Sequence, residues 1–317
     1  MHGRWPGSPG ANGLTVGRHG AKRSRVLAVF VVVASALATA LLSGAAGART
    51  PPTHAYYVSL GDSYSVGYQP TLGATPGYAG YVAARTHLTL VNFGCAGATT
   101  TSILNTVGCR AVLPHTAGGM TYPTTTQIAA AEAFLTSHRG QIGLITVTIG
   151  GIEVIPCALK PNALACAVAA MKNVDTNVKA LASDLRNAAG PAVPIIGSTY
   201  PDVGLGAYVW PNRTFTPSTV SLAQPSVTAF KVLINPTLEK AYATANGAFV
   251  DVTAAMGAYT SLSRTVKTRV YGTIPAPVAS LCALDWFCAR GDIHPRTSGY
   301  TVIGKLVAAR YAAMRRA

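Results

Sequence analysis

The chain has 317 residues, of which 49% are hydrophobic and 11% are charged, with 25 Lys and Arg against ten Asp and Glu. The basic residues are scattered and do not alternate with aromatic ones, which argues against nucleic-acid binding. A net charge of this sign instead favours peripheral contact with an anionic envelope or membrane surface. The sequence contains no internal repeat and no linker-like stretch, so we expect one folded domain.

The first 48 residues have the pattern of a secretory signal peptide. Basic residues precede an apolar run at positions 26–42, and Ala46 and Ala48 follow in the A-x-A spacing of a cleavage site. We predict cleavage near Ala48 and secretion of residues 49–317. An uncleaved membrane anchor is the alternative, but an apolar run of this length is at the short limit for a membrane span. The signal carries five of the Lys and Arg and none of the Asp and Glu, so the mature chain has 20 against ten, a net charge of +10.

All six cysteines lie in the predicted mature part of the chain, and an even number in an exported protein indicates disulfides. They fall into three close pairs, and this spacing favours the bonds Cys95–Cys109, Cys157–Cys166 and Cys282–Cys288. A metal site is the alternative, but no C-x-x-C spacing is present. We therefore expect no metal at these cysteines.

Apolar segments with strand and helix patterns alternate along the chain. Strands are predicted at 56–60, 88–93, 141–149, 193–199 and 248–252. Helices are predicted at 77–86, 125–137, 164–189, 218–245 and 295–316, the fourth interrupted near Pro225 and Pro236. Loops are expected at 105–123, at 200–217 with several aromatic residues, and over most of 253–290. The alternation predicts an α/β fold, a three-layer α/β/α sandwich with a mainly parallel five-stranded sheet.

The first predicted strand stops abruptly at Gly61-Asp62-Ser63, which places Ser63 on a tight turn at the carboxyl end of a strand. Open α/β sheets bind their ligands at this edge. If a helix begins there, its free N–H groups lie beside the serine hydroxyl and can stabilise an oxyanion. The alternative is that Asp62 or Ser63 only caps the helix.

A serine nucleophile needs a base, and histidine is the usual one. His294 lies in Gly-Asp-Ile-His-Pro just before the last predicted helix, with Asp292 close enough in sequence to orient its ring. A surface histidine at a helix start is the alternative. The other histidines of the mature chain occur in ordinary strand-edge or loop contexts, at His54, His87, His115 and His138.

Four short motifs together resemble those of the SGNH hydrolases, also called the GDSL esterase/lipase family. The resemblance covers nearly the whole mature chain, in the segments 61–65, 92–98, 148–153 and 292–300. It implies that Ser63 is the nucleophile, that the backbone N–H groups of Ser63 and Gly97 form the oxyanion hole, and that His294 is the base. It also implies a secreted esterase or lipase that acts on a small-molecule or lipid ester without a cofactor. We expect a monomer.

The chain departs from the family pattern at two positions. The third motif normally carries an Asn whose side chain donates to the oxyanion, and here Ile152 stands in its place. The family's acid usually lies three residues before the histidine, where this chain has Gly291. Asp292 can take the role in a shifted turn, a backbone carbonyl can orient His294 instead, and Asp285 is a more distant candidate.

Two other functions remain open at this point. Ile152 raises the alternative of a weakly active or inactive envelope-binding or lipid-binding protein on the same fold. An α/β-hydrolase also orders its residues as Ser, Asp and His, but it requires Gly-x-Ser-x-Gly, and residue 65 is Ser.

Overall fold

The computed structural model describes residues 54–109, 117–211 and 217–316. The predicted signal peptide, its cleavage site at Ala48 and His115 lie outside these residues. No helix in the described ranges is both long and apolar enough to cross a membrane.

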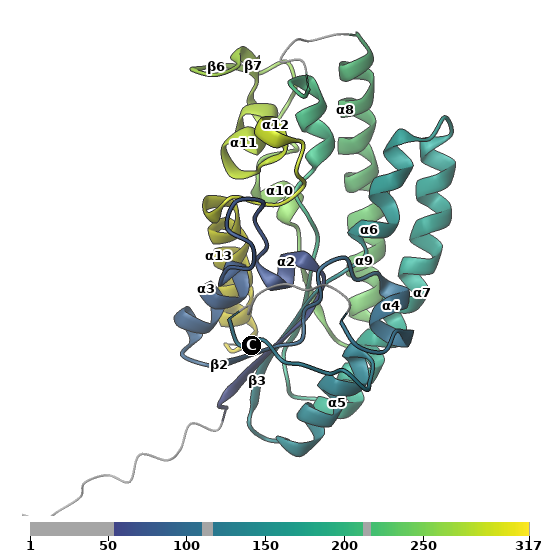
Figure 1. The fold of residues 1–317 in the computed structure, drawn as a ribbon, viewed down its shortest axis with the longest axis vertical. Coiled ribbons are helices and arrows are strands. Elements are labelled where there is room, and N and C mark those ends of the chain that lie inside the picture. Colours follow the sequence, from purple (N-terminus) through teal and green to yellow (C-terminus); the bar gives the residue numbers. More distant parts are fainter. Residues whose placement is uncertain (1–53, 110–116, 212–216, 317) are drawn as a thin grey trace, which may run out of the picture. The chain divides into compact units, whose positions relative to one another are not determined.

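Five parallel strands form the central sheet, in the order β2-β1-β3-β4-β5 (Figure 1). The strands are β1 (Tyr56–Gly61), β2 (Thr89–Asn92), β3 (Ile142–Thr148), β4 (Ile195–Ser198) and β5 (Ala248–Val250). Strand β3 is buried along its whole length, as expected of a parallel strand covered on both faces. The direction of winding reverses between β1 and β3, and ligands bind at such switch points.

Helices cover both faces of the sheet and complete a three-layer α/β/α sandwich, as predicted. Helices α5 (Gln127–Ser137), α7 (Ala163–Ala189) and α9 (Asn235–Ala243) cover one face and share a core with Val58 and Leu60 of β1. The other face is covered by α3 (Gly77–Thr86) and α13 (Thr297–Met314), which pack around Tyr57 and Leu144. The alternation of side chains along β1 thus supplies two separate cores.

Short helices follow the carboxyl ends of the strands and connect the layers. They are α2 (Ser63–Val66), α4 (Thr100–Asn105), α6 (Gly151–Val154), the 3₁₀ segments η1 (Ile155–Leu159) and η2 (Val203–Tyr208), and α8 (Pro217–Ala229). The helix predicted at 218–245 runs through Pro225 instead of breaking there, and its irregularity is the π-helical segment η3 (Phe230–Ile234). Pro236 directly follows η3, in the first turn of α9.

The prediction that 253–290 is mostly loop was wrong. The segment contains α10 (Val252–Ala255), the hairpin of β6 (Thr265–Thr268) and β7 (Gly272–Pro275), α11 (Ala276–Leu284) and α12 (Phe287–Arg290). Helix α11 is apolar almost all round, so the polar face that marks a surface helix is missing from its sequence. The exposed β6 strand, Thr-Val-Lys-Thr, carries no alternation that leads to a core. These elements escaped prediction because their patterns are weak.

The region also forms a third small core around η2 and α11. Leu205, Tyr208 and Val209, predicted to lie in a loop, are buried there with Val278 and Leu281. The cysteines are bonded in the pairs that their spacing favoured, Cys95–Cys109, Cys157–Cys166 and Cys282–Cys288. The last pair joins α11 to α12 just before the segment that carries His294.

Candidate active site

Ser63 is the first residue of α2 and directly follows the end of β1. At Gly61 the backbone has φ +130°, and a Cβ atom there would lie 2.0 Å from the carbonyl oxygen of Thr148. Only glycine therefore lets the chain turn this close to β3. The Asp62 carboxylate accepts a hydrogen bond from the Tyr64 N–H at 2.9 Å and caps the helix. Capping and the placement of Ser63 are two consequences of the same turn.

The structure brings His294 to Ser63, although 231 positions separate them in the sequence. The His294 Nε2 atom lies 2.7 Å from Ser63 Oγ, and Nδ1 lies 2.8 Å from Asp292 Oδ1. In the neutral ring, an Nδ1–H that donates to the carboxylate leaves the Nε2 lone pair free to accept the serine hydroxyl. The three side chains have the mutual contacts of a nucleophile, a base and an orienting acid.

Asp292 rather than Asp285 contacts the histidine ring. Oδ1 of Asp292 also accepts the His294 backbone N–H at 3.0 Å, so the carboxylate fixes both the ring and its own turn. Asp285 is buried and accepts the Phe287 N–H at 2.8 Å, and it makes no hydrogen bond to His294 in the described structure. Burial raises the pKa of Asp285 well above its usual value. Its position argues against Asp285 as the orienting acid.

The environment of Asp292 favours its charged form. Partial burial raises the pKa of this carboxyl, but the hydrogen bond and the charge of His294 outweigh that effect and hold the pKa below its usual value. An ionised Asp292 is the form that stabilises an imidazolium after proton transfer.

The loop that carries His294 is held from several sides. The Trp286 N–H donates to the His294 carbonyl at 3.0 Å, and the Tyr64 hydroxyl donates to the Ile293 carbonyl. Gly291 has φ +68°, and a Cβ atom there would lie 2.7 Å from the indole of Trp210. Trp210, an aromatic residue of the predicted loop at 200–217, thus packs against the loop that carries His294.

A buried polar network beneath Ser63 was not foreseen from the sequence. Asp62 is 2% exposed, and its second oxygen accepts the hydroxyl of Tyr200 at 2.6 Å. Burial raises the pKa of Asp62 to about 6, against the lowering effect of the bonds from Tyr200 and Tyr64. The Tyr200 ring packs edge-on against Tyr64 and lies so close to Gly151 that a Cβ atom would be 2.9 Å from it. The end of β4 thereby supports the turns after β1 and β3.

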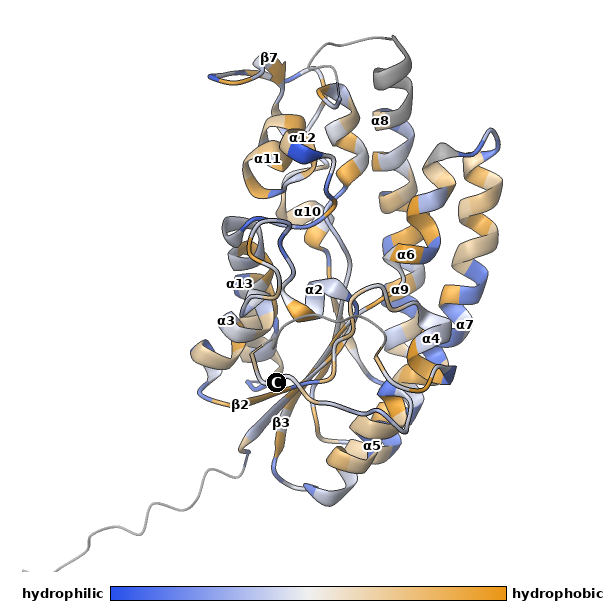
Figure 2. Cartoon of the chain, viewed as in Figure 1, coloured by the Kyte–Doolittle hydropathy of each residue, from blue (hydrophilic) through white to orange (hydrophobic). Residues whose placement is uncertain are grey.

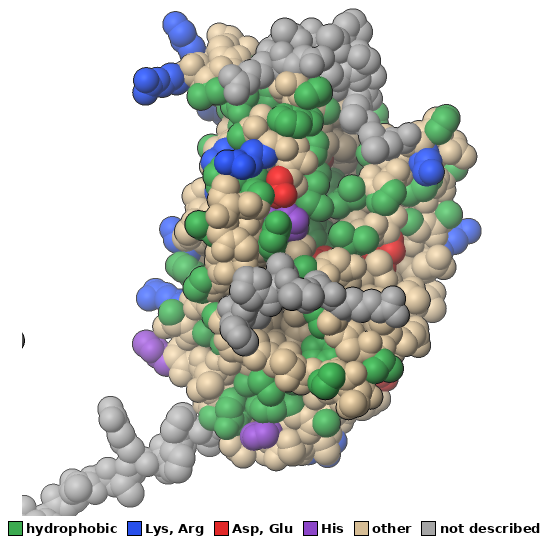
Figure 3. All heavy atoms as spheres, in the orientation of Figure 1, with side chains coloured by type: hydrophobic (Ala, Val, Ile, Leu, Met, Phe, Trp, Pro, Cys, Tyr) green, Lys and Arg blue, Asp and Glu red, His purple; other side chains and the backbone are tan. Residues whose placement is uncertain are grey.

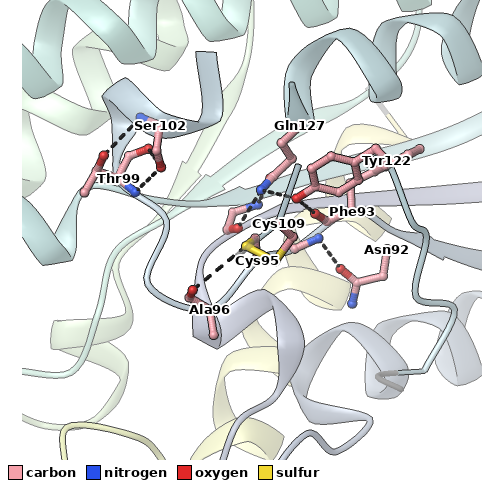
Figure 4. Close-up of a disulfide and its surroundings, with 11 residues drawn as sticks. Asn92, Phe93, Cys95, Ala96, Thr99, Ser102, Cys109, Tyr122 and Gln127 are labelled. Carbon is pink, nitrogen blue, oxygen red and sulfur yellow. Dashed lines mark hydrogen bonds between the residues drawn. A yellow bond between two sulfur atoms is a disulfide. The ribbon is translucent and has the colours of Figure 1, made fainter. Parts of the chain in front are cut away.

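The end of β2 is fastened to the nucleophile turn by hydrogen bonds. The Asn92 side chain donates to the Ser65 carbonyl at 2.8 Å and accepts the Gly94 N–H at 2.9 Å. The Cys95 N–H donates to the Gly61 carbonyl at 2.9 Å. Figure 4 shows Asn92, Cys95 and the Cys95–Cys109 disulfide in this loop. The loop leads directly to Gly97.

Gly97 is exposed, has φ +78°, and has open space where a side chain would lie. Within the described ranges, neither its N–H nor that of Ser63 donates to another backbone group. Both are therefore available to a ligand oxygen.

Gln127, the first residue of α5, was also missed. Its side-chain amide accepts the Gly61 N–H at 2.7 Å and donates to the Gly61 carbonyl at 3.2 Å, and Figure 4 shows it beside the disulfide. A buried glutamine at the start of a helix is the signal that could have revealed it, because such a group needs polar partners.

The turn after β3 contains the third motif, residues 148–153. Gly150 caps α6 with φ +107°, and the Glu153 carboxylate accepts the Thr100 N–H at the start of α4 at 2.5 Å. Glu153 thus joins the second and third motifs. Ile152 is half-buried in the same turn, and its side chain has no group that can donate a hydrogen bond.

An apolar cavity of about 340 Å³ opens beside the site. Its wall includes Tyr64, which follows Ser63, and Ile293, which precedes His294. From there it extends between α6, η1 and α7 on one side and α8 and η3 on the other, along residues such as Met171, Ala229 and Phe230. Figure 3 shows a hollow with hydrophobic side chains on this face. The shape and lining suit an alkyl chain.

In the part of the chain that the structure describes, no group of three or more His, Cys, Asp or Glu side chains is placed to hold a metal ion. Polar side chains around Ser63, such as Asp62, Asn92 and Gln127, instead bond to the backbone.

No protein-family profile matches the sequence, and no curated protein sequence is detectably similar to it. The structure is similar to a phospholipase A1 from Streptomyces albidoflavus, with 17% identity over 81% of this chain and 98% of the other, at a TM-score of 0.45. It is also similar to an extracellular lipase from Streptomyces rimosus, with 20% identity over 81% and 99% of the two chains and a TM-score of 0.44. A lipolytic protein of the G-D-S-L family from Desulfitobacterium hafniense gives 12% identity over 81% and 99%, with a TM-score of 0.38. At these identities and TM-scores the function has to be argued from the site itself.

Proposed function

We propose that this protein is a secreted serine hydrolase of the SGNH type that cleaves carboxylic esters through an acyl-enzyme on Ser63. The observation that carries the proposal is the hydrogen-bonded series Ser63–His294–Asp292, at 2.7 and 2.8 Å, on the carboxyl edge of a parallel sheet. Ser63 lies 231 positions from His294 in the sequence, and each of the three members has the partner that its chemical role requires.

The reaction proceeds in two halves. His294 Nε2 takes the proton of Ser63 while Oγ attacks the ester carbonyl, and the N–H groups of Ser63 and Gly97 hold the tetrahedral oxyanion. Collapse breaks the ester C–O bond, and His294 returns the proton to the departing alcohol. Water then adds to the acyl-enzyme with His294 again as base, which releases the carboxylic acid and regenerates Ser63.

The apolar cavity supports an ester with an alkyl acyl group. It begins beside Tyr64 and Ile293, so a chain lying in it has its carboxyl end near the serine hydroxyl. A lipid ester or a medium-chain ester therefore fits better than a small polar one. Three disulfides are consistent with an oxidising compartment, and hence with export.

The test is hydrolysis of a series of p-nitrophenyl esters by residues 49–317. We expect activity to rise from acetate to medium acyl chains, and to fall to the uncatalysed level in Ser63→Ala. Labelling by a fluorophosphonate probe should occur in the parent and be lost in the same variant. Full activity in Ser63→Ala would exclude the assignment.

The second candidate is a binding protein with little or no turnover, and Ile152 is the observation that favours it. Loss of one oxyanion donor typically costs roughly 10²–10³ in turnover. A folded protein that binds long-chain esters, resists the fluorophosphonate probe and releases no p-nitrophenol would support this candidate over the hydrolase.

A further inference from the structure

The segment formed by η1 and the first turns of α7 exposes apolar side chains to solvent, and we call it the arm. Leu164 is 69% exposed, Val168 38% and Ile155 36%. Leu164 and Val168 are four residues apart on α7 and so lie on one face of the helix. Figure 2 shows hydrophobic colour over α6 and the start of α7. Clustered exposure of this kind marks an interaction surface.

This apolar surface is continuous with the cavity. Ile155 and Leu164 are exposed and also line the cavity wall, which extends to Tyr64 and Ile293 beside the catalytic pair. An alkyl chain could therefore pass from the outer surface of the arm to Ser63 without leaving apolar surroundings. The arm also keeps its shape, because the Cys157–Cys166 bond joins η1 to α7.

The arm itself carries only positive side chains. Positions 155–174 contain two lysines and no acidic residue, and the nearest carboxylates in the sequence, Glu153 and Asp175, are bonded to the Thr100 N–H and to Lys179. Lys160 is exposed at the turn after η1, and exposed Lys172 continues the row that Leu164 and Val168 begin. A second projection, the β6–β7 hairpin, repeats the combination, with Val270 59% exposed beside Lys267 and Arg269. Apolar side chains with flanking cations are the features of a peripheral lipid-binding surface.

We propose that the arm docks on a lipid surface that carries anionic headgroups, with Leu164 and Val168 entering the acyl boundary and Lys160 and Lys172 at the headgroups. The inference rests on the proposed function, since the surface then delivers a lipid ester to the cavity that leads to Ser63. A lipid surface is favoured over a second copy, because two identical arms would bring Lys160 and Lys172 of both copies together.

The first test measures binding separately from catalysis. Ser63→Ala protein, which cannot consume the lipid, is sedimented with vesicles of phosphatidylcholine alone or mixed with phosphatidylglycerol. We expect binding to the mixed vesicles that weakens with salt. Adding Leu164→Ser and Val168→Ser should weaken it roughly tenfold. Lys160→Gln with Lys172→Gln should remove about fivefold per lysine on the anionic vesicles only.

Leu72→Ser is the matched control, because Leu72 is 62% exposed but lies in the loop between α2 and α3. It should bind as the parent does. With Ser63 restored, Val168→Ser and Lys160→Gln/Lys172→Gln protein, whose substituted side chains do not line the cavity, should hydrolyse soluble p-nitrophenyl acetate at the parent rate, which separates this inference from the proposed function. The melting temperature of Leu164→Ser/Val168→Ser protein checks that it folds. Equal vesicle binding by parent and Leu164→Ser/Val168→Ser protein would overturn the proposal. So would a dimer in solution that the same variants dissolve, since a second copy would then cover the arm.

Discussion

The nucleophile turn and the arm lie on either side of the cavity and are built in opposite ways. Around Ser63, the polar side chains of Asp62, Asn92, Gln127 and Tyr200 are buried and hydrogen-bonded to the backbone or to one another. The arm is apolar, partly exposed and held by a disulfide. Chemistry needs atoms fixed within fractions of an ångström, whereas binding an alkyl chain needs only apolar area. Substitutions should therefore affect turnover strongly at the turn and weakly at the arm.

The largest expected effect is that of Asp292→Asn. The amide carries no charge to support an imidazolium, and its N–H can donate to Nδ1 and hold the ring in the wrong tautomer, so turnover should fall about 10³–10⁴-fold. The measurement is kcat on a p-nitrophenyl ester. Asp285→Asn is the matched control and should change kcat by no more than a few fold, because Asp285 makes no hydrogen bond to His294 in the described structure. Equal losses of kcat in both variants would show that Asp292 is not the acid that orients His294.

The third motif lacks a side-chain donor to the oxyanion, because Ile152 stands where the family pattern has Asn. Ile152→Asn tests whether this donor limits turnover. An amide at this position would add a donor to the oxyanion, and we expect kcat to rise by roughly 10²-fold with little change in thermal stability. Ile152→Leu serves as the control and should leave kcat unchanged. If the parent is already fast and the asparagine brings no gain, another group in the site already serves as the third donor.

The polar turn was predictable only where its residues follow one another in sequence. Gly61-Asp62-Ser63 and Asp292-Ile293-His294 are local patterns with a local meaning, and the alternation of strands and helices places them at one edge of a sheet. The positions of Gln127 and Tyr200 depend on packing between segments that are far apart in the sequence. No local pattern predicts the hydrogen bond between Tyr200, which follows β4, and Asp62. The contact between Ser63 and His294 could likewise only be hypothesised from the sequence.

The arm and the segment from 253 to 290 show the opposite limitation. The cysteine spacing predicted the closed loop at Cys157–Cys166, because a short separation leaves few other geometries. The exposure of Leu164 was not predictable, because the amphipathic pattern of α7 indicates only the face that packs against the sheet. The first turns of α7 extend beyond the sheet, and the pattern predicts nothing about them. Helix α11 was missed because its sequence is apolar almost all round.

The buried acid beneath Ser63 makes the turn sensitive to pH in a way that the arm is not. The pKa of Asp62 is about 6 in the folded protein, above the ordinary value of about 3.9 in the unfolded chain. The folded state thus binds more protons between these values, so stability is lost as pH rises through that window, by roughly 3 kcal/mol in total. Asp62→Asn removes this titrating carboxyl and its contribution to the pH dependence of the free energy of unfolding. Urea denaturation at pH 4 and pH 7 should show a smaller fall in the free energy of unfolding for the variant, and parallel profiles would contradict the assignment.

The smallest effect on turnover is expected at the arm, and a comparison of the disulfide in the arm with the one in the loop of Gly97 measures the difference directly. Removing Cys157–Cys166, in Cys157→Ser/Cys166→Ser, opens a loop with a separation of nine residues and should lower the free energy of unfolding by roughly 2.5 kcal/mol. Turnover of p-nitrophenyl acetate should stay within about twofold, because η1 and α7 contribute no hydrogen bond to Ser63, Asp292 or His294 in the described residues. The matched pair Cys95→Ser/Cys109→Ser opens a separation of 14 residues and costs a similar roughly 3 kcal/mol. That bond, however, anchors the loop of Gly97, so turnover should fall with stability. Equal turnover in the two double variants would mean that the loop of Gly97 does not hold the oxyanion.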